Sequence, residues 1–129
     1  LHFKEAARLK QQEADLASLH QKEFVLSTSV HSWESYKKLS TLFSYALIGP
    51  VFNSISKQGY NAMKHTLPAN KNSSVRSIAI GGITKENCNS AVLKHFDGIA
   101  VLGSIWLDKS PLQEFKLIQQ TWNTTGRHY

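Results

Sequence analysis

The segments AIGGI at 79–83 and DGIAVLGSI at 97–105 repeat one design, a short apolar run that ends in glycine. An apolar run without polar alternation is typical of a strand that is buried on both faces of a parallel sheet. Glycines at the carboxyl end of such a strand expose backbone N–H groups at the turn into a helix, where the helix dipole favours an anion. We therefore expect two neighbouring strand ends that hold a phosphate through backbone amides.

The rest of the chain alternates apolar strands with amphipathic helices. Three helix starts carry capping residues, which are Ser32, Thr84 and Ser110, and Pro111 suits a first helical position. A long polar connection at 53–74 holds one short candidate helix at 62–67, and connections of this length are often functional. The predicted strands are 1–3, 24–30, 45–48, 78–80 and 98–102.

Apolar residues at spacings of three and four predict four amphipathic helices, the first of which spans 5–21. The other three follow the capping residues. Their predicted inner stripes are Leu9, Leu16 and Leu19 in the first helix, Trp33, Tyr36, Leu39 and Phe43 in the second, Cys88, Ala91, Val92 and His95 in the third, and Leu112, Phe115, Ile118 and Trp122 in the last.

Buried strands that alternate with helices predict a single α/β domain, residues 1–129, with a parallel sheet. Two architectures fit five strand-helix units. One is a small, complete doubly wound sheet; the other is part of a (β/α)8 TIM barrel, which normally needs about 250 residues. The chain opens with Leu1 inside a predicted strand, which favours a barrel fragment.

Composition narrows the classes of function. The formal net charge is +6, but Lys37-Lys38 is the longest basic run and no nucleic-acid-binding signature occurs, so we expect no nucleic-acid partner. A positive charge suits small phosphorylated substrates equally well. The absence of a membrane span or signal peptide predicts a cytoplasmic protein. The single cysteine, Cys88, reads as a small buried residue.

Five motifs follow one another in register: LHF at 1–3, SVHS at 29–32, IGPVF at 48–52 with SK at 56–57, AIGGI at 79–83, and DGIAV at 97–101. In order and spacing they resemble the thiamine-phosphate synthase/TenI family. The resemblance covers the chain from residue 1 to about 122. It implies a (β/α)8 barrel of which this chain is the last five units. Members join a pyrimidine pyrophosphate to a thiazole phosphate or, in the TenI branch, isomerise the thiazole carboxylate phosphate.

The resemblance also assigns roles to residues at the strand ends. It implies that Lys57 stabilises the departing pyrophosphate and that His31 moves a proton in the TenI branch; imidazole suits acid–base work near neutral pH. His2 and His95 are further imidazoles, of which His95 is interpreted as structural. The implied pyrophosphate ligands are Ser29, Ser54, Ser56 and Lys57, and the two glycine turns supply Gly81, Gly82, Leu102, Gly103 and Ser104 for the thiazole phosphate.

One segment departs from the synthase pattern. Synthases show Gly-Gln-x-Asp after the first histidine, with an aspartate that helps to bind magnesium, whereas this chain reads KEAA at 4–7. Ala7 has no metal-binding group, and Glu5 offers a hard oxygen ligand where the family has glutamine. The metal ligands are therefore not identified. The implied cofactor is Mg²⁺ for a synthase and none for a tautomerase.

Three functions remain open from the sequence: a thiamine-phosphate synthase, a TenI-type tautomerase that uses His31, and a non-catalytic thiazole-phosphate-binding homologue or inactive fragment. All take small phosphorylated pyrimidine or thiazole ligands. A barrel portion also leaves two strand edges unpaired, so we expect the isolated 129-residue chain to dimerise or aggregate as a homo-oligomer.

Overall fold

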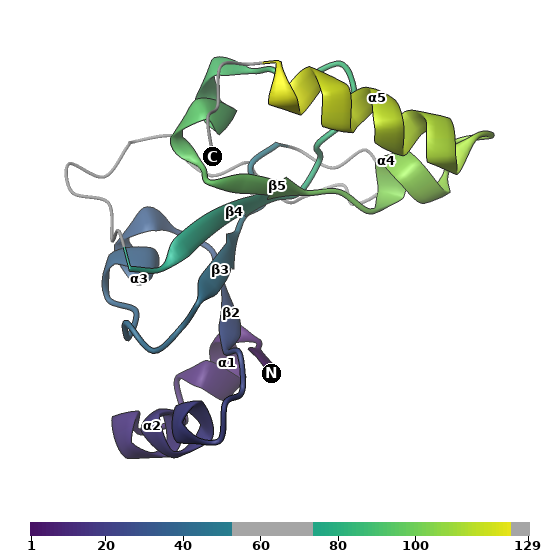
Figure 1. Cartoon of the computed structure of the whole chain (residues 1–129). Coiled ribbons are helices and arrows are strands. Elements are labelled where there is room, and N and C mark those ends of the chain that lie inside the picture. The colour runs from purple at the N-terminus through teal and green to yellow at the C-terminus, as the bar shows by residue number, and fades with distance from the viewer. Residues whose placement is uncertain (53–73, 125–129) are drawn as a thin grey trace.

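The computed structural model describes residues 1–52 and 74–124. Within these two ranges, five parallel strands form one sheet in the order β1-β2-β3-β4-β5, which is also their order in the chain. Figure 1 shows that this sheet curves strongly from β2 to β5. The strands are β1 (His2–Phe3), β2 (Ser27–Val30), β3 (Tyr45–Ile48), β4 (Arg76–Ile80) and β5 (Gly98–Ala100).

The strand order decides between the two expected architectures. A doubly wound sheet reverses its strand order at a switch point, whereas consecutive units of a (β/α)8 barrel add strands in one direction. The order of the described strands has no reversal. The expectation of a barrel portion is therefore confirmed, and the alternative of a small doubly wound sheet is wrong.

The two faces of the sheet are covered unequally. Strand register places Val30, Ile48 and Ala79 side by side, and all three are buried beneath the helices. The neighbouring row on the opposite face contains Ser29 and Leu47, which are only half-buried. In Figure 1, α3 and α5 lie on the convex side of the sheet, and the concave side faces away from both helices. The concave side corresponds to the interior of a barrel.

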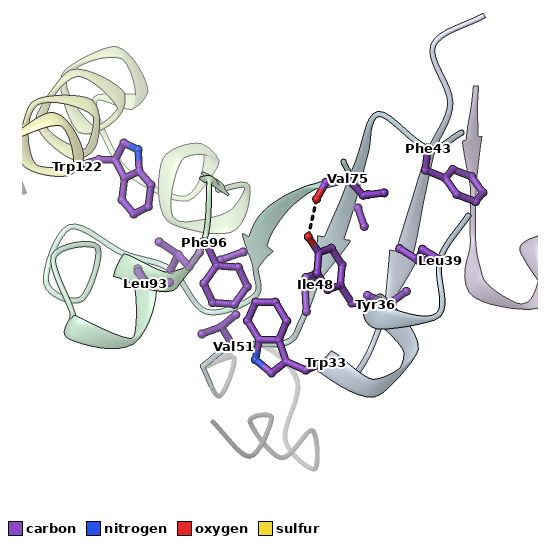
Figure 2. Close-up of a cluster of buried hydrophobic side chains, with 14 of the residues drawn as sticks. Trp33, Tyr36, Leu39, Phe43, Ile48, Val51, Val75, Leu93, Phe96 and Trp122 are labelled. Atoms are coloured by element: carbon purple, nitrogen blue, oxygen red, sulfur yellow. Dashed lines mark hydrogen bonds between the residues drawn. The ribbon is translucent and has the colours of Figure 1, made fainter. Parts of the chain in front are cut away.

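An aromatic cluster holds helix α3 (Trp33–Lys37) against the sheet, as Figure 2 shows. The Trp33 ring centroid lies 4.9 Å from that of Phe96 and 5.4 Å from that of Tyr36. The buried Tyr36 hydroxyl donates to the Val75 carbonyl oxygen. Ser32 caps the helix as predicted, because its hydroxyl accepts a 3.1 Å hydrogen bond from the Ser35 N–H.

The predicted helix 5–21 is wrong in its continuity. The structure has α1 (Glu5–Arg8) and α2 (Glu13–Gln21), and the Gln12 N–H donates to the Asp15 carboxylate at 3.2 Å, which starts a second helix. Leu9 falls in the break and is 72% exposed, whereas Leu16 is buried. The strand predicted at 24–30 also starts late, at Ser27.

The predicted helix after Thr84 is wrong as well. Thr84 is followed by turns instead of an α-helix, and then by a 3₁₀ helix, η1 (Ala91–His95), in which Leu93 rather than His95 is buried. Asn87 explains part of this result, because its side chain bonds the Thr84 N–H and the Gly82 carbonyl, and such local bonds compete with a helix. Cys88 is buried as predicted, and burial raises the pKa of its thiol.

Two helices follow β5. They are the short α4 (Gly103–Trp106) and the final helix α5 (Pro111–Asn123), which has Pro111 in its first turn. The Ser110 side chain makes no cap bond; its N–H donates to Asp108 at 2.8 Å instead. The buried stripe is Glu114, Ile118 and Trp122, while the predicted Leu112 and Phe115 are exposed. No helix within the described residues is both long and apolar enough to cross a membrane.

The buried stripe of α5 includes Glu114, whose carboxylate pairs with an exposed lysine. Lys85, which follows the glycine turn of β4, lies 3.2 Å from the Glu114 carboxylate. The hydrogen bond and charge of Glu114 raise the pKa of Lys85. This pair ties the segment after β4 to the last helix.

Candidate active site

The carboxyl ends of the five strands meet at one edge of the sheet, because neighbouring strands are parallel. This edge is called the strand-end rim below. Glu5 follows β1, His31 follows β2, Gly49 follows β3, and the turn 81–82 follows β4. Residues 102–104 follow β5, so each described candidate lies at or next to the rim. Barrel enzymes place their chemistry at this edge.

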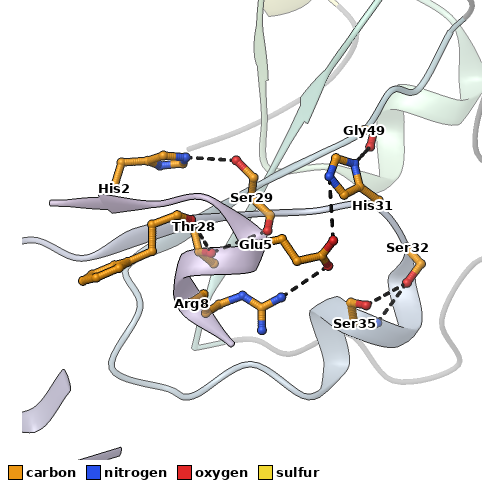
Figure 3. Close-up of polar contacts among 10 residues, drawn as sticks. His2, Glu5, Arg8, Thr28, Ser29, His31, Ser32, Ser35 and Gly49 are labelled. Carbon is orange, nitrogen blue, oxygen red and sulfur yellow. Dashed lines mark hydrogen bonds and ion pairs between the residues drawn. The ribbon is translucent and has the colours of Figure 1, made fainter. Parts of the chain in front are cut away.

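His31 connects the ends of two neighbouring strands. Its Nδ1 atom lies 2.9 Å from the Gly49 carbonyl oxygen, which can only accept, so Nδ1 carries a proton. Its Nε2 atom lies 3.8 Å from a carboxylate oxygen of Glu5. Figure 3 shows the ring between these two acceptors. The side chain is 65% exposed, which leaves the ring open to solvent and to a ligand.

Glu5 is engaged on both oxygens. Oε1 accepts from the Arg8 guanidinium at 3.4 Å, and Oε2 faces His31. Glu5 is thus paired with one cation and lies beside His31, whereas a magnesium site needs several oxygen ligands. The described residues contain no group of three His, Cys, Asp or Glu side chains that could hold a metal ion. The described residues therefore do not supply a complete set of metal ligands around Glu5.

Ser29 lies on the concave face of β2, beside the rim. Its hydroxyl is 2.9 Å from His2 Nε2, and the Ser27 hydroxyl is 2.9 Å from Nδ1 of the same ring. Figure 3 shows His2 reaching across from β1 to Ser29. Sequence reasoning missed these contacts of His2, although residues 27 and 29 have the two-residue spacing that places them on one face of a strand. It also missed Arg8, whose spacing from Glu5 is that of neighbours on a helix.

The glycine turn after β4 has the backbone that its sequence predicts. Gly81 and Gly82 have φ angles of 102° and 65°, which favour glycine. A Cβ atom on Gly81 would lie 2.7 Å from Cα of Pro50, so the turn also packs against the end of β3. Asn87 holds the next residues through its bonds to the Gly82 carbonyl and the Thr84 N–H, both at 2.8 Å.

The second turn has a different geometry. Leu102 is 70% exposed, and Gly103 begins the four-residue helix α4. The Ser104 hydroxyl oxygen is buried and has no hydrogen-bond partner among the described residues. The two turns follow strands that pair directly, with Ile80 opposite Ala100. The structure thus brings both turns to adjacent positions on the rim.

The remaining predicted ligands fall on a segment that the structure does not describe. Ser54, Ser56 and Lys57, and the candidate helix at 62–67, lie within residues 53–73. The described residues do form a hollow of about 200 Å³, lined by Arg8, Leu16 and Phe43 among others. It lies between α1, α2 and the segment that leads into β3, and its lining includes none of the predicted ligands.

A family model described as thiamine monophosphate synthase (TMP-TENI) matches residues 7–105. This match covers more than half of the chain and includes the strand-end residues from β2 to β5. The chain belongs to the thiamine monophosphate synthase family. Its membership confirms the resemblance inferred from the five motifs.

Two curated relatives agree with this assignment to the thiamine monophosphate synthase family. The thiamine-phosphate synthase of Anoxybacillus flavithermus is 33% identical over 87 residues, which are 62% of this chain and 39% of the relative. That of Koribacter versatilis is 31% identical over 90 residues, or 67% of this chain and 43% of the relative. These matches span about two fifths of the length of each relative.

Solved structures of similar proteins share the fold. The thiamine phosphate pyrophosphorylase of Pyrococcus furiosus superposes with a TM-score of 0.67 at 17% identity, over 98% of this chain and 60% of that protein. The thiamine phosphate pyrophosphorylase of Bacteroides thetaiotaomicron gives a TM-score of 0.54 at 22% identity, over 81% of this chain and 55% of that protein. The chain therefore has the same fold as the part of those proteins that it matches.

Proposed function

We propose that the protein is a transferase of thiamine biosynthesis, a thiamine-phosphate synthase that joins hydroxymethylpyrimidine pyrophosphate to thiazole phosphate. The observation that carries the proposal is the family match across residues 7–105, which contains the strand-end motifs of β2 to β5. Curated relatives with that name support it. The net charge of +6 would attract both phosphorylated substrates.

In the proposed reaction the bond between the pyrimidine methylene carbon and pyrophosphate breaks, and pyrophosphate leaves with the electron pair. The thiazole nitrogen then forms a C–N bond to the resulting pyrimidine cation. Ser29, Ser54, Ser56 and Lys57 would hold the departing pyrophosphate. Preorganised donors of this kind lower a barrier because charge develops on the leaving group.

The thiazole phosphate would bind at the other part of the rim. Gly81 and Gly82 supply a turn that has no side chains of its own and that positive φ angles shape, and Gly103 begins the short helix beside it. Ser104 and Leu102 complete this second turn. The two phosphate positions then lie along one rim, from β2 and β3 to β4 and β5, which suits a reaction between two phosphorylated molecules.

Magnesium, the cofactor that the resemblance implies, would neutralise the leaving pyrophosphate. The described residues hold no group of three His, Cys, Asp or Glu side chains that could bind it by themselves, and no part of the mechanism above depends on its ligands. His31 would hold the ends of β2 and β3 together in the synthase. A proton transfer by His31 belongs to the tautomerase alternative, which serves as one arm of the test.

The test compares two activities in the full-length protein. A synthase releases pyrophosphate only when both substrates and magnesium are present, and His31→Asn, which keeps an amide near the Nδ1 position, retains most of the rate. Proton exchange on the thiazole carboxylate phosphate that persists with a chelator and disappears in His31→Ala would instead establish the tautomerase. Binding of thiazole phosphate without either reaction would establish a non-catalytic homologue.

A further inference from the structure

His2 bridges two serine hydroxyls on the concave face of the sheet. Register places His2 opposite Ser27, and Ser29 lies two residues further along β2 on the same face. The imidazole spans both hydroxyls, with Nδ1 2.9 Å from Ser27 Oγ and Nε2 2.9 Å from Ser29 Oγ. Ser27 is 2% exposed, whereas Ser29 is half-buried.

The position of the ring proton determines what Ser29 can do. A neutral imidazole has one N–H donor and one accepting nitrogen. If Nε2 accepts, the Ser29 hydroxyl donates its only proton to His2 and cannot donate to a ligand. If Nε2 donates, the Ser29 oxygen accepts from His2, and its own proton is free for another acceptor.

The burial of Ser27 favours the second arrangement. Within the described residues, the Ser27 hydroxyl has one hydrogen-bond partner, His2 Nδ1. A buried O–H without an acceptor costs about 1–3 kcal/mol, so Ser27 should donate to Nδ1. The ring proton of neutral His2 then resides on Nε2 and points at Ser29. In the charged ring Nε2 also donates to Ser29.

We propose that Ser27 and His2 form a relay that presents the Ser29 hydroxyl as a donor to an oxygen of pyrophosphate. His2 is thus a positioning residue, because it acts through Ser29. The proposal rests on the proposed function, in which Ser29 is a pyrophosphate ligand. Ser29 is half-buried, and it lies on the face of β2 opposite to the buried Val30, so its hydroxyl is not enclosed by the core beneath the helices.

Two conservative substitutions separate positioning from simple packing. His2→Gln places an amide near the former Nε2 atom, and can donate to Ser29. His2→Asn places its amide near Nδ1, and contacts Ser27 only. Binding of inorganic pyrophosphate to the full-length protein is measured by titration calorimetry for both variants, for Ser29→Ala, and for the double variant with His2→Asn and Ser29→Ala.

We expect Ser29→Ala and His2→Asn each to weaken pyrophosphate binding about tenfold, which is the value of one hydrogen bond to a charged group at the low end of its range. His2→Gln stays within about threefold of wild type, and the double variant is no weaker than Ser29→Ala alone, because both changes act on one contact. Equal affinities of the Asn and Gln variants, or additive effects in the double variant, would overturn the relay.

The tautomer of His2 gives a second readout that needs no substitution. Two-bond ¹⁵N–¹H correlation spectra of the wild-type protein should show a proton on Nε2. A proton on Nδ1 alone would overturn the relay while leaving the proposed function standing. A wild-type protein that binds no pyrophosphate would instead overturn the proposed function and, with it, the anion-binding purpose of the relay.

Discussion

His31 Nδ1 donates a 2.9 Å hydrogen bond to the Gly49 carbonyl oxygen, which joins the end of β2 to the end of β3. His31 belongs to the SVHS motif at the end of β2, and Gly49 belongs to the IGPVF motif at the end of β3; both motifs carry the family resemblance. The bond therefore fixes the spacing of the rim at the position where pyrophosphate would bind.

The His31 bond predicts a graded response to substitution. His31→Ala should lower the free energy of unfolding by about 0.5–1.5 kcal/mol, because it removes one partly exposed hydrogen bond. His31→Asn should lose less, since its amide can still donate to Gly49. Urea unfolding measures both values. Equal losses for the two variants would show that the Gly49 bond contributes no stability.

The Gly81 turn should not accept a side chain. Gly81→Ala combines a positive φ of 102° with a Cβ only 2.7 Å from Pro50 Cα, and should destabilise the fold by about 2–4 kcal/mol. Gly103→Ala is the matched control, because the nearest atom to its Cβ is 3.9 Å away. Thermal unfolding should show a large drop in Tm for the first variant and none for the second.

Tyr36 predicts a loss of stability at alkaline pH. Burial, followed by the charge of Asp97, raises the pKa of Tyr36 to about 12. The folded state keeps the phenol protonated after the unfolded chain has released its proton near pH 10, so stability falls as the pH rises from 10 to 12. The loss should reach about 2 kcal/mol.

The control for this titration is Tyr36→Phe. This variant should be less stable at neutral pH, because the Val75 carbonyl loses its donor, and it should lack the Tyr36 part of the alkaline loss. Lys85, whose pKa is also raised, contributes to both proteins alike. Denaturant unfolding at pH 8 and pH 11 gives the difference. Identical pH slopes for the two proteins would contradict the assignment.

The half-buried carboxylate of Asp97, just before β5, ties that strand to β4. Asp97 accepts from the Ser77 backbone N–H at 2.8 Å and from the Ser77 hydroxyl at 3.1 Å. Asp97→Ala leaves the Ser77 N–H without this acceptor and should cost about 2–3 kcal/mol. Asp97→Asn, which keeps one carbonyl oxygen, should retain part of that stability. Calorimetric unfolding that ranked Asn below Ala would contradict this role.

The strands and the rim could be predicted from sequence because their signals are local. Runs such as 78–80 are apolar throughout, and the positive φ angles of Gly81 and Gly82 agree with a turn that needs glycine. The helix predictions were wrong where contacts of particular side chains outweighed the spacing of the apolar residues. Glu114 is buried and pairs with Lys85, and the side chain of Asn87 bonds the backbone that a helix would have used.

The contacts of the histidines could not be predicted, because they depend on strand register. His2 meets Ser29 only because β1 pairs with β2 at the Ser27 position. In the same way, His31 meets Gly49 because β2 and β3 are neighbours. Sequence spacing alone gives the face of a strand on which a residue lies, but not the residue opposite it.

The central claim is that the protein is a synthase in which Lys57 holds the departing pyrophosphate. Pyrophosphate release by the full-length protein tests this claim most directly. With hydroxymethylpyrimidine pyrophosphate, thiazole phosphate and magnesium, wild type should release pyrophosphate, and Lys57→Ala should slow release by about 10²–10³-fold. Lys71→Ala, which removes one charge from the same segment, should leave the rate nearly unchanged. Release that needs no thiazole phosphate, or that is equal in both variants, would contradict the account.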